Sequence, residues 1–395
     1  MVDSLRKEPE RHELRALLLL DRLTGVGPAT LRAIVERFGS AVVALRASRT
    51  AFASVAGKQA ADERSDRALR DEVDLALRRA DRLRMRVLTW TSPQYPDRLR
   101  HLVDPPPVLF LRGRTELLAP RAVTLVGARR ATVRARDVAE RLGAALARAG
   151  LTVTSGLALG IDAAAHRGAL SAGGDTVAVL GTGADRAYPR ANARLFGRIV
   201  REGLVVSEFL PGTLALPHHF PRRNRILAAL GTATVVVEAG ARSGSLITVD
   251  HALDLGREVW VVPGPIERPT CAGSNALLLE GARPVLSVAH LVSELAPRSA
   301  GPGSASGGAG AAVVAPQVPI AAPSGPVPAP PDASERSVDG RDAAVLAALA
   351  EGALSGDEVA ERTGLPVHEA LTRLTALELS GAVRRLPGMR YGSAA

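Results

Sequence analysis

Short apolar runs alternate with amphipathic helical patterns through the middle of the chain. Between residues 122 and 288 the apolar runs are rich in β-branched residues, and the segments between them repeat apolar positions every three or four residues. Continuous apolar strands between helices predict a parallel sheet that is covered on both faces, which is a doubly wound, Rossmann-like α/β domain. The expected strands are AVTLVG (122–127), LTVTSG (151–156), TVAVLG (176–181), LVVSEF (204–209), ATVVVEA (233–239) and EVWVVPG (258–264).

The pattern changes on both sides of this region. Residues 1–85 are helical in pattern and predict a small helical N-terminal domain, and 86–298 form the α/β core, with RVLTW and PVLFLRG as further strands at its edge. Residues 299–337 hold too much Gly and Pro to pack, and predict a linker. Residues 338–395 give three helical segments and a short basic hairpin, which is the order of a winged helix.

The loops after the expected strands combine glycine with hydroxyl groups or arginine. In an open α/β sheet, ligands bind beyond the carboxyl ends of the strands, where loops lead into helices. Glycine lets backbone N–H groups approach an anion, the helix dipole favours negative charge, and arginine donates two hydrogen bonds at once. We therefore predict an anion-binding edge formed by GARRAT (127–132), SGLALGID (155–162), GTGADRAYP (181–189), EFLPGTLALPHHFPRRNR (208–225) and EAGARSGSLIT (238–248).

The segment SGLALGIDAAAH raises the alternative of a hydrolase triad, because Ser155, Asp162 and His166 fall within it. A triad requires the three side chains to meet in space. Asp162 and His166 are four residues apart on one expected helix, whereas Ser155 ends a strand across a glycine loop. We interpret Ser155 as a phosphate ligand and Asp162 as the helix N-cap, with plain helix capping as the alternative for the whole loop. The role of His166 stays open.

Cofactor and metal patterns are missing from the sequence. GARRAT lacks the second glycine of the dinucleotide fingerprint, GTGADR lacks the third, and no P-loop occurs. The single cysteine, Cys271, and the pair His218-His219 do not form a recognisable set of metal ligands. No apolar run is long enough to span a membrane. We expect no cofactor, no metal, no membrane segment and a cytoplasmic location.

The positive charge is concentrated in the α/β core. The chain carries a net charge of +10, and residues 86–298 alone hold 26 basic and 17 acidic residues, whereas 338–395 hold 6 and 8. An anionic polymer would therefore bind to the core. Only 3% of the residues are aromatic, so arginine and backbone contacts to phosphate must lead. Tyr188 and Phe220 are the candidates for stacking on bases, and a core position for Phe220 is an equal alternative.

Nine motifs, in order between Val126 and Ala282, resemble the DprA/Smf family of DNA-processing proteins, and the resemblance runs from about Tyr95 to Ala282. They are VGARRAT, SGLALGIDAAAHRGAL, VAVLGTG, YPRAN, SEFLPGT, FPRRNRILAAL, VVVEAGARSGSLIT, REVWVVPG and GSNALLLEGA. The resemblance implies a protein without catalytic activity that binds and shields single-stranded DNA of any sequence and loads RecA onto it in natural transformation. It also implies a homodimer, for which residues 275–282 are the candidate contact.

The resemblance further implies a set of binding residues, and the chain departs from the family pattern in two places. Ala128 stands where a serine is usual, and Arg134-Ala135 stand where Tyr-Gly is frequent, so Arg134 either adds a phosphate contact or faces solvent. The implied DNA-binding residues are Gly127, Arg129, Ser155, Gly156, Gly160, Asp162, Phe220, Arg223, Asn224, Arg225, Ser243, Gly244, Ser245 and Thr248.

Other interpretations of the chain remain. The anion-binding edge also fits a hydrolase of nucleoside monophosphates, with Glu238 or Asp162 as acid or base. The winged helix could read duplex DNA, but its net charge of −2 favours a contact with protein. In the N-terminal domain, LTGVGPATL is either a helix-hairpin-helix turn that exposes the amides of Gly25 and Gly27 to phosphate, or a turn inside a packed domain.

Overall fold

The computed structural model describes residues 2–119, 121–296, 340–350, 352, 354–379, 382–386 and 390–393. They belong to two compact units, Met1–Gly303 and Ser304–Ala395. The expected linker, 299–337, lies outside the described residues. In the described parts of the chain, no helix is long and apolar enough to cross a membrane.

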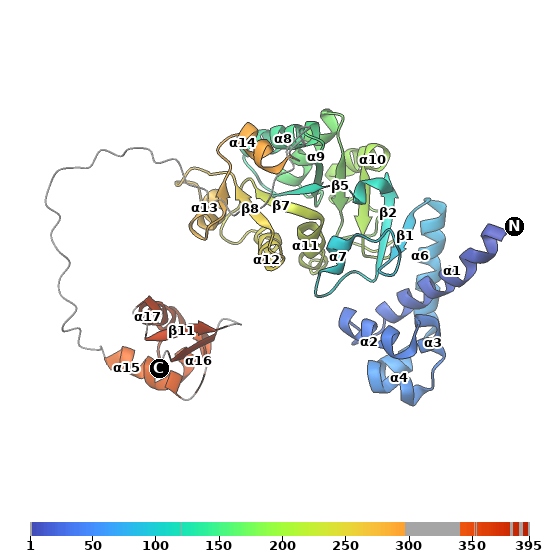
Figure 1. Ribbon diagram of the computed structural model, residues 1–395, viewed down its shortest axis with the longest axis horizontal. Coiled ribbons are helices and arrows are strands. Elements are labelled where there is room, and N and C mark those ends of the chain that lie inside the picture. Colours follow the sequence, from blue (N-terminus) through green and yellow to red (C-terminus); the bar gives the residue numbers. More distant parts are fainter. Residues whose placement is uncertain are drawn as a thin grey trace, which may run out of the picture. The chain divides into compact units, whose positions relative to one another are not determined.

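A nine-stranded sheet forms the centre of the first unit, in the order β1-β2-β6-β5-β4-β3-β7-β8-β9 (Figure 1). The strands from β3 to β9 pair in parallel, and β1 and β2 are an antiparallel pair added beside β6. All six core strands and both edge strands expected from the sequence are therefore confirmed. The strands are β1 (Arg86–Thr89), β2 (Val108–Gly113), β3 (Ala122–Val126), β4 (Thr152–Ser155), β5 (Thr176–Val179), β6 (Leu204–Ser207), β7 (Gly231–Val236), β8 (Glu258–Val261) and β9 (Arg283–Pro284).

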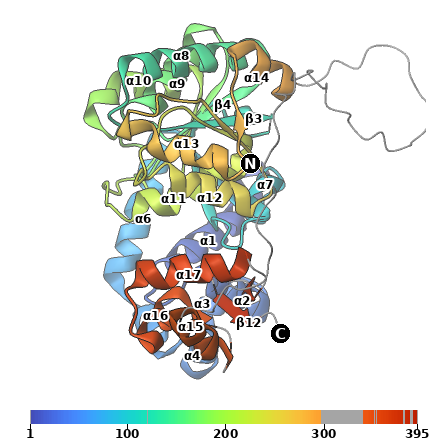
Figure 2. The ribbon, with the colours of Figure 1, turned by 90° about the vertical axis from the view of Figure 1, so that its left-hand side faces the viewer.

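Helices cover both faces of the sheet, which confirms the doubly wound fold (Figures 1 and 2). Alternate residues of one strand point to opposite faces. In β3, Leu125 packs with α8, α9 and α14, and Val126 packs with α11, α12 and α13. The helices of the core are α7 (Asp97–Arg100), α8 (Val133–Arg148), α9 (Ile161–Ser171), α10 (Ala193–Glu202), α11 (His219–Leu230), α12 (Leu246–Asp254), α13 (Ala272–Leu279) and α14 (Val288–Leu295), with 3₁₀ turns at Thr115–Leu118, Arg190–Asn192 and Pro269–Cys271.

The direction of the strand order reverses between β3 and β7. From β3 the chain proceeds through β4 and β5 to β6 on one side, then returns to place β7 and β8 on the other side of β3. The loops after β3 and β7 therefore begin at neighbouring strand ends and lead away in opposite directions. A crevice at such a point is where ligands bind in open α/β sheets.

The N-terminal domain is helical, as expected, and packs directly on the core. Residues 17–20 at the end of α1 are all buried, and they belong to one apolar cluster with Phe110 of β2 and Val205 of β6. In the turn after α1, Thr24 N–H donates to Glu63 Oε2 at 2.8 Å, whereas Gly25 and Gly27 are exposed, so both interpretations of this turn stay predictions. The helices are α1 (Val2–Asp21), α2 (Pro28–Phe38), α3 (Ala41–Arg46), α4 (Arg49–Ala56), α5 (Lys58–Glu63) and α6 (Arg67–Arg82).

The second unit is a winged helix, as expected. Its three-stranded sheet has the order β10-β12-β11, and a capping box between Ser355 and Glu358 begins its second helix. On α17, Arg373 forms an ion pair with Asp342 at 2.7 Å, so this charge is already compensated within the unit. The elements are α15 (Gly340–Ala350), β10 (Leu354–Ser355), α16 (Gly356–Thr363), α17 (Val367–Leu379), β11 (Val383–Leu386) and β12 (Arg390–Ser393).

Candidate nucleic-acid interface

A cleft of about 890 Å³ opens at the carboxyl edge of the sheet, at the point where the strand order reverses. Its walls come from the loops after β3, β4, β5, β6, β7 and β8 and from the first turns of α9, α11 and α12. The loops predicted from the sequence therefore meet in one cleft. Ten of the fourteen predicted residues line it: Gly127, Arg129, Asp162, Phe220, Arg223, Asn224, Ser243, Gly244, Ser245 and Thr248.

Two glycines let the loops after β3, β4 and β7 approach one another closely. A Cβ atom on Gly127 would lie 2.7 Å from Ile161 Cγ1, and one on Gly160 would lie 2.2 Å from Ala128 O. Gly160 also has a φ of +77°, a conformation that favours glycine. A backbone hydrogen bond also joins the loops after β3 and β7, since Ala128 N–H donates to Glu238 O at 2.6 Å. Gly160 therefore supports the cleft from behind and does not line it.

Glu238 serves the same loop. Its carboxylate accepts a hydrogen bond from Thr132 Oγ1 at 2.7 Å, where Thr132 caps α8. A carboxylate held in this way fixes the loop of residues 127–132. This contact accounts for an acidic residue at a strand end without a role as acid or base.

The structure corrects the roles predicted for Ser155 and Gly156. The Ser155 side chain is fully buried, and its hydroxyl donates to Leu125 O at 2.6 Å. Neither Ser155 nor Gly156 lines the cleft, and both are buried. Ser155 holds β4 to β3 and is not placed to contact phosphate.

Asp162 is not the N-cap of α9. That position belongs to Gly160, and Asp162 stands in the first turn of the helix. Its Oδ2 accepts from the backbone N–H groups of Gly156 at 3.1 Å and Ala158 at 3.3 Å, so it turns back onto the loop. Burial raises the pKa of Asp162, and the nearby Arg223 opposes that shift. Asp162 shapes the loop that forms one wall of the cleft.

Arg223 lies at the floor of the cleft and is 4% exposed. Its guanidinium donates to Gly156 O at 3.0 Å and to Val179 O, and thereby joins the ends of β4 and β5. Burial lowers the pKa of Arg223 to about 10, so the group keeps its charge at neutral pH. Arg223 contributes a positive charge to the cleft, but most of its N–H donors already form hydrogen bonds within the protein.

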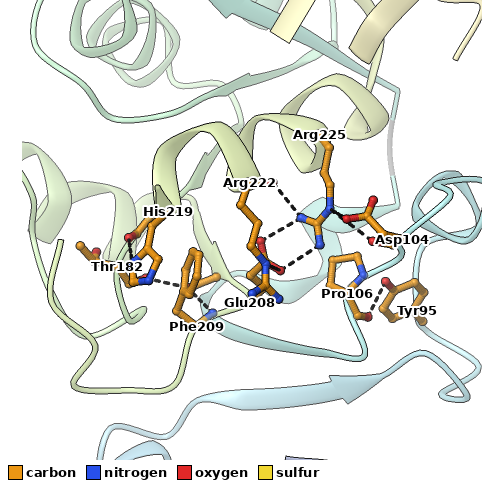
Figure 3. A network of polar contacts seen from close by, with 11 residues as sticks. Tyr95, Asp104, Pro106, Thr182, Glu208, Phe209, His219, Arg222 and Arg225 are labelled. Atoms are coloured by element: carbon orange, nitrogen blue, oxygen red, sulfur yellow. Dashed lines mark hydrogen bonds and ion pairs between the residues drawn. The ribbon is translucent and has the colours of Figure 1, made fainter. Parts of the chain in front are cut away.

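Arg225 does not line the cleft, which corrects its predicted role as a phosphate ligand. Figure 3 shows its guanidinium between Asp104 and Glu208. Its Nε lies 2.8 Å from Asp104 Oδ2, and its Nη1 lies 2.8 Å from Glu208 Oε1. The Arg225 and Glu208 side chains are only 4% and 1% exposed. Arg225 therefore holds α11 to the loops after α7 and β6 from inside the protein.

Three exposed arginines line the cleft: Arg129, Arg130 and Arg242. None of them forms an ion pair with any residue that the structure describes. Arg130 and Arg242 were missed among the predicted residues, although each stands in a glycine-containing loop after a core strand. Ser243 and Ser245 directly precede α12, and their hydroxyl oxygens lie 2.7 Å apart. The site thus combines free arginines with hydroxyls at a helix start, a set that suits phosphate.

An aromatic pair lines part of the cleft. The rings of Tyr188 and Phe220 have centroids 5.5 Å apart, and the guanidinium carbon of Arg129 lies 5.3 Å from the Phe220 centroid. Tyr188 lines the cleft and is 44% exposed, so it is accessible to a ligand there. Phe220 is partly buried, so its position lies between the two predicted alternatives, a core residue and a residue that stacks on bases.

His166 is a core residue. Its ring is fully buried, and Nδ1 lies 2.7 Å from Thr176 Oγ1. Burial lowers the pKa of His166 to about 3, so the ring is neutral near pH 7. His166 reaches the backbone of Ser155, but the Ser155 hydroxyl donates to Leu125 O instead of to the ring, so the two side chains do not form a catalytic pair.

We expect His166 to make the fold less stable in mild acid. The unfolded chain binds the proton near pH 6.5 and the folded chain near pH 3, so stability falls as the pH drops through 6.5, by about 2 kcal/mol between pH 7 and pH 5. Denaturant unfolding of wild type and His166→Gln at both pH values measures the difference. Equal pH dependence in the two proteins would contradict this assignment.

The chain is similar to one known protein family over both of its units. The family described as DNA recombination-mediator protein A matches residues 86–296, and the DprA winged helix domain matches 328–389. Protein Smf of Escherichia coli (strain K12) is 35% identical over 306 residues, which cover 75% of this chain and 74% of that protein. DNA processing protein DprA of Streptococcus pneumoniae is 43% identical over 200 residues, which cover 51% of this chain and 71% of that protein. The X-ray structure of DprA from Streptococcus pneumoniae has a TM-score of 0.61 and 33% identity, and covers 72% of this chain and 97% of its own. The chain therefore belongs to the DNA recombination-mediator protein A family, also called DprA/Smf, and its second unit is the winged helix of that family.

Proposed function

We propose that this protein has no catalytic activity, binds single-stranded DNA of any sequence, protects it, and loads RecA onto it. The observation that carries the proposal is the charge around the cleft. Exposed arginines that form no ion pair within the described residues occur in the loops or first helical turns at the carboxyl edge of the sheet. They are Arg129, Arg130, Arg134, Arg136, Arg190, Arg194, Arg242 and Arg268.

The composition of the cleft supports binding without sequence preference. Arginine, serine and backbone N–H groups recognise phosphate, which carries no sequence information. The aromatic pair of Tyr188 and Phe220 can stack on any base, because every base has a π-face. The bases of a duplex are already stacked on one another, so this pair favours a single strand.

The nucleotide hydrolase is the weaker alternative. Its two candidate carboxylates are held by the protein itself, Glu238 by Thr132 and Asp162 by loop amides. Incubation with nucleoside monophosphates, followed by chromatography for free base, tests it directly. Release of base at a catalytic rate would favour the hydrolase.

Self-association and RecA loading rest on family membership together with the surface of the core. Leu279, inside the candidate contact 275–282, is 93% exposed, and Leu253 and Ile266 are also exposed. Apolar side chains in such positions suit a contact with a second copy of this chain. We place the protein in the cytoplasm and assign a protein contact to the winged helix.

We expect the full chain to bind a single-stranded oligonucleotide more tightly than its duplex, with strong salt dependence. The slope of log K against log salt should be about −0.7 for each phosphate contacted. Fluorescence anisotropy at several salt concentrations measures both properties. Equal affinity for strand and duplex, or a slope near zero, would contradict the proposed function.

A further inference from the structure

An acidic residue beside the cleft connects it to the helical domain. Asp185 follows β5, and its side chain is 2% exposed. Its Oδ1 accepts from Gly212 N–H, in the loop after β6, at 2.8 Å. Its Oδ2 lies 2.7 Å from Nε of Arg79, on α6 of the helical domain. One buried carboxylate therefore joins two loops of the core to the N-terminal domain.

The loops after β5 and β6 are bound together by further hydrogen bonds. Gly183 N–H donates to Thr213 O at 3.1 Å, and Arg186 Nε donates to Gly212 O at 2.8 Å. Two residues beyond Arg186 the first loop presents Tyr188, and the second loop continues through Pro217 into α11 and Phe220. These bonds hold the segments that carry the aromatic pair in one arrangement.

The apolar packing follows the same path. Ala76, Leu77 and Ala80 of α6 belong to the same buried cluster as Ala184, next to Asp185, and Leu210, near Gly212. The helical domain therefore supports both loops through packing as well as through charge. Arg79 is its ionic contact with them and is itself 39% exposed, so it can be replaced without opening a cavity.

We propose that Arg79 is a positioning residue for the DNA cleft: from the helical domain, it holds the loops that place Tyr188 against Phe220. The inference rests on the proposed function and states how the base-binding part of the cleft is held in position. Without Arg79, Asp185 is a buried carboxylate without a cation, and the loops must rearrange to hydrate it. Arg130 and Arg242 stand on the loops after β3 and β7, outside the hydrogen bonds described above, so their contacts with phosphate stay in place.

The test separates base binding from phosphate binding. Full-length Arg79→Met keeps an unbranched apolar stem and removes the guanidinium with its charge. We expect the affinity for an oligothymidylate to fall about fivefold, which is part of the binding free energy that one stacked base contributes. We expect affinity for an abasic strand of equal length to stay the same. Arg79→Lys should restore most of the loss, and the control Arg49→Met, which breaks an exposed pair with Asp62, should change neither affinity.

Two further measurements complete the test. In a Tyr188→Ala background, Arg79→Met should cause no additional loss, because the aromatic pair is already broken. Amide exchange of residues 183–189 and 209–216 should be faster in Arg79→Met than in wild type. Asp185→Asn, which keeps an acceptor for Gly212 N–H, replaces Arg79→Met if that variant does not fold.

Three results would overturn the inference. Arg79→Met could leave the affinity for oligothymidylate unchanged, or lower the affinity for oligothymidylate and for the abasic strand equally. The losses from Arg79→Met and Tyr188→Ala could also add up in the double variant. If wild type fails to bind the single strand at all, the proposed function fails. In that case faster amide exchange would still support the link between Arg79 and the loops, and unchanged exchange would overturn it.

Discussion

Replacing Arg129 and Arg242 together by alanine should weaken binding of a single-stranded oligonucleotide roughly 30-fold at 0.1 M salt. Both side chains are exposed, line the cleft and form no ion pair with described residues. Each charge-assisted contact with phosphate contributes about 1 kcal/mol in such a screened position. The slope of log K against log salt should also become shallower, by about 0.7 for each arginine removed.

The control removes the same charge from the opposite edge of the sheet. Arg121 precedes β3 and Arg148 ends α8, and both are exposed without an ion pair among the described residues. If the position of the arginines determines the affinity, and not the net charge of the protein, Arg121→Ala/Arg148→Ala should change the affinity for the oligonucleotide less than threefold. Salt-titrated anisotropy of the two double variants compares them directly, and equal losses would show that the cleft is not the binding site.

Replacing Glu208 by alanine should lower the free energy of unfolding by about 3–5 kcal/mol, because it leaves the buried Arg225 without its main counter-ion. Asp104 remains as a partner, but its side chain is 46% exposed and therefore compensates less. Arg222 loses the same carboxylate, from which its Nε lies 3.0 Å away (Figure 3). Glu208→Gln keeps an acceptor at this position and should cost less than Glu208→Ala.

Tryptophan fluorescence in denaturant measures this loss in the first unit alone, since both tryptophans of the chain, Trp90 and Trp260, lie there. Arg49→Ala is the matched control, because its pair with Asp62 is exposed, and it should cost less than 1 kcal/mol. A loss of that small size in Glu208→Ala would show that the pair is not important for stability.

The core strands and the edge that carries the cleft could be predicted from the sequence. Apolar runs such as TVAVL have few alternatives to a buried strand, and parallel strands bring all of their carboxyl ends to one edge. Once the strands are placed in one parallel sheet, the loops that begin at Gly127 and Glu238 must lie at the same edge of that sheet. Most of the predicted binding residues therefore line one cleft.

The fate of individual side chains could not be predicted, and FPRRNR illustrates why. Arg223 lies at the floor of the cleft, whereas Arg225, two residues later on the same helix, is buried against Glu208 and Asp104. Both carboxylates are distant in sequence, so the pattern of the helix does not reveal its partners. The Ser155 hydroxyl poses the same problem, because its acceptor is a carbonyl of the neighbouring strand.

The apolar cluster shared by α1, β2 and β6 determines where the chain can be cut. A fragment beginning at residue 86 would expose Val108, Phe110 and Val205, which the helical domain now helps to bury. Such a fragment would carry an adhesive apolar surface and would tend to aggregate. The boundary at residues 85 and 86 separates two patterns of sequence, but it does not separate two pieces that can be handled independently. Biochemical work on the cleft needs the helical domain attached.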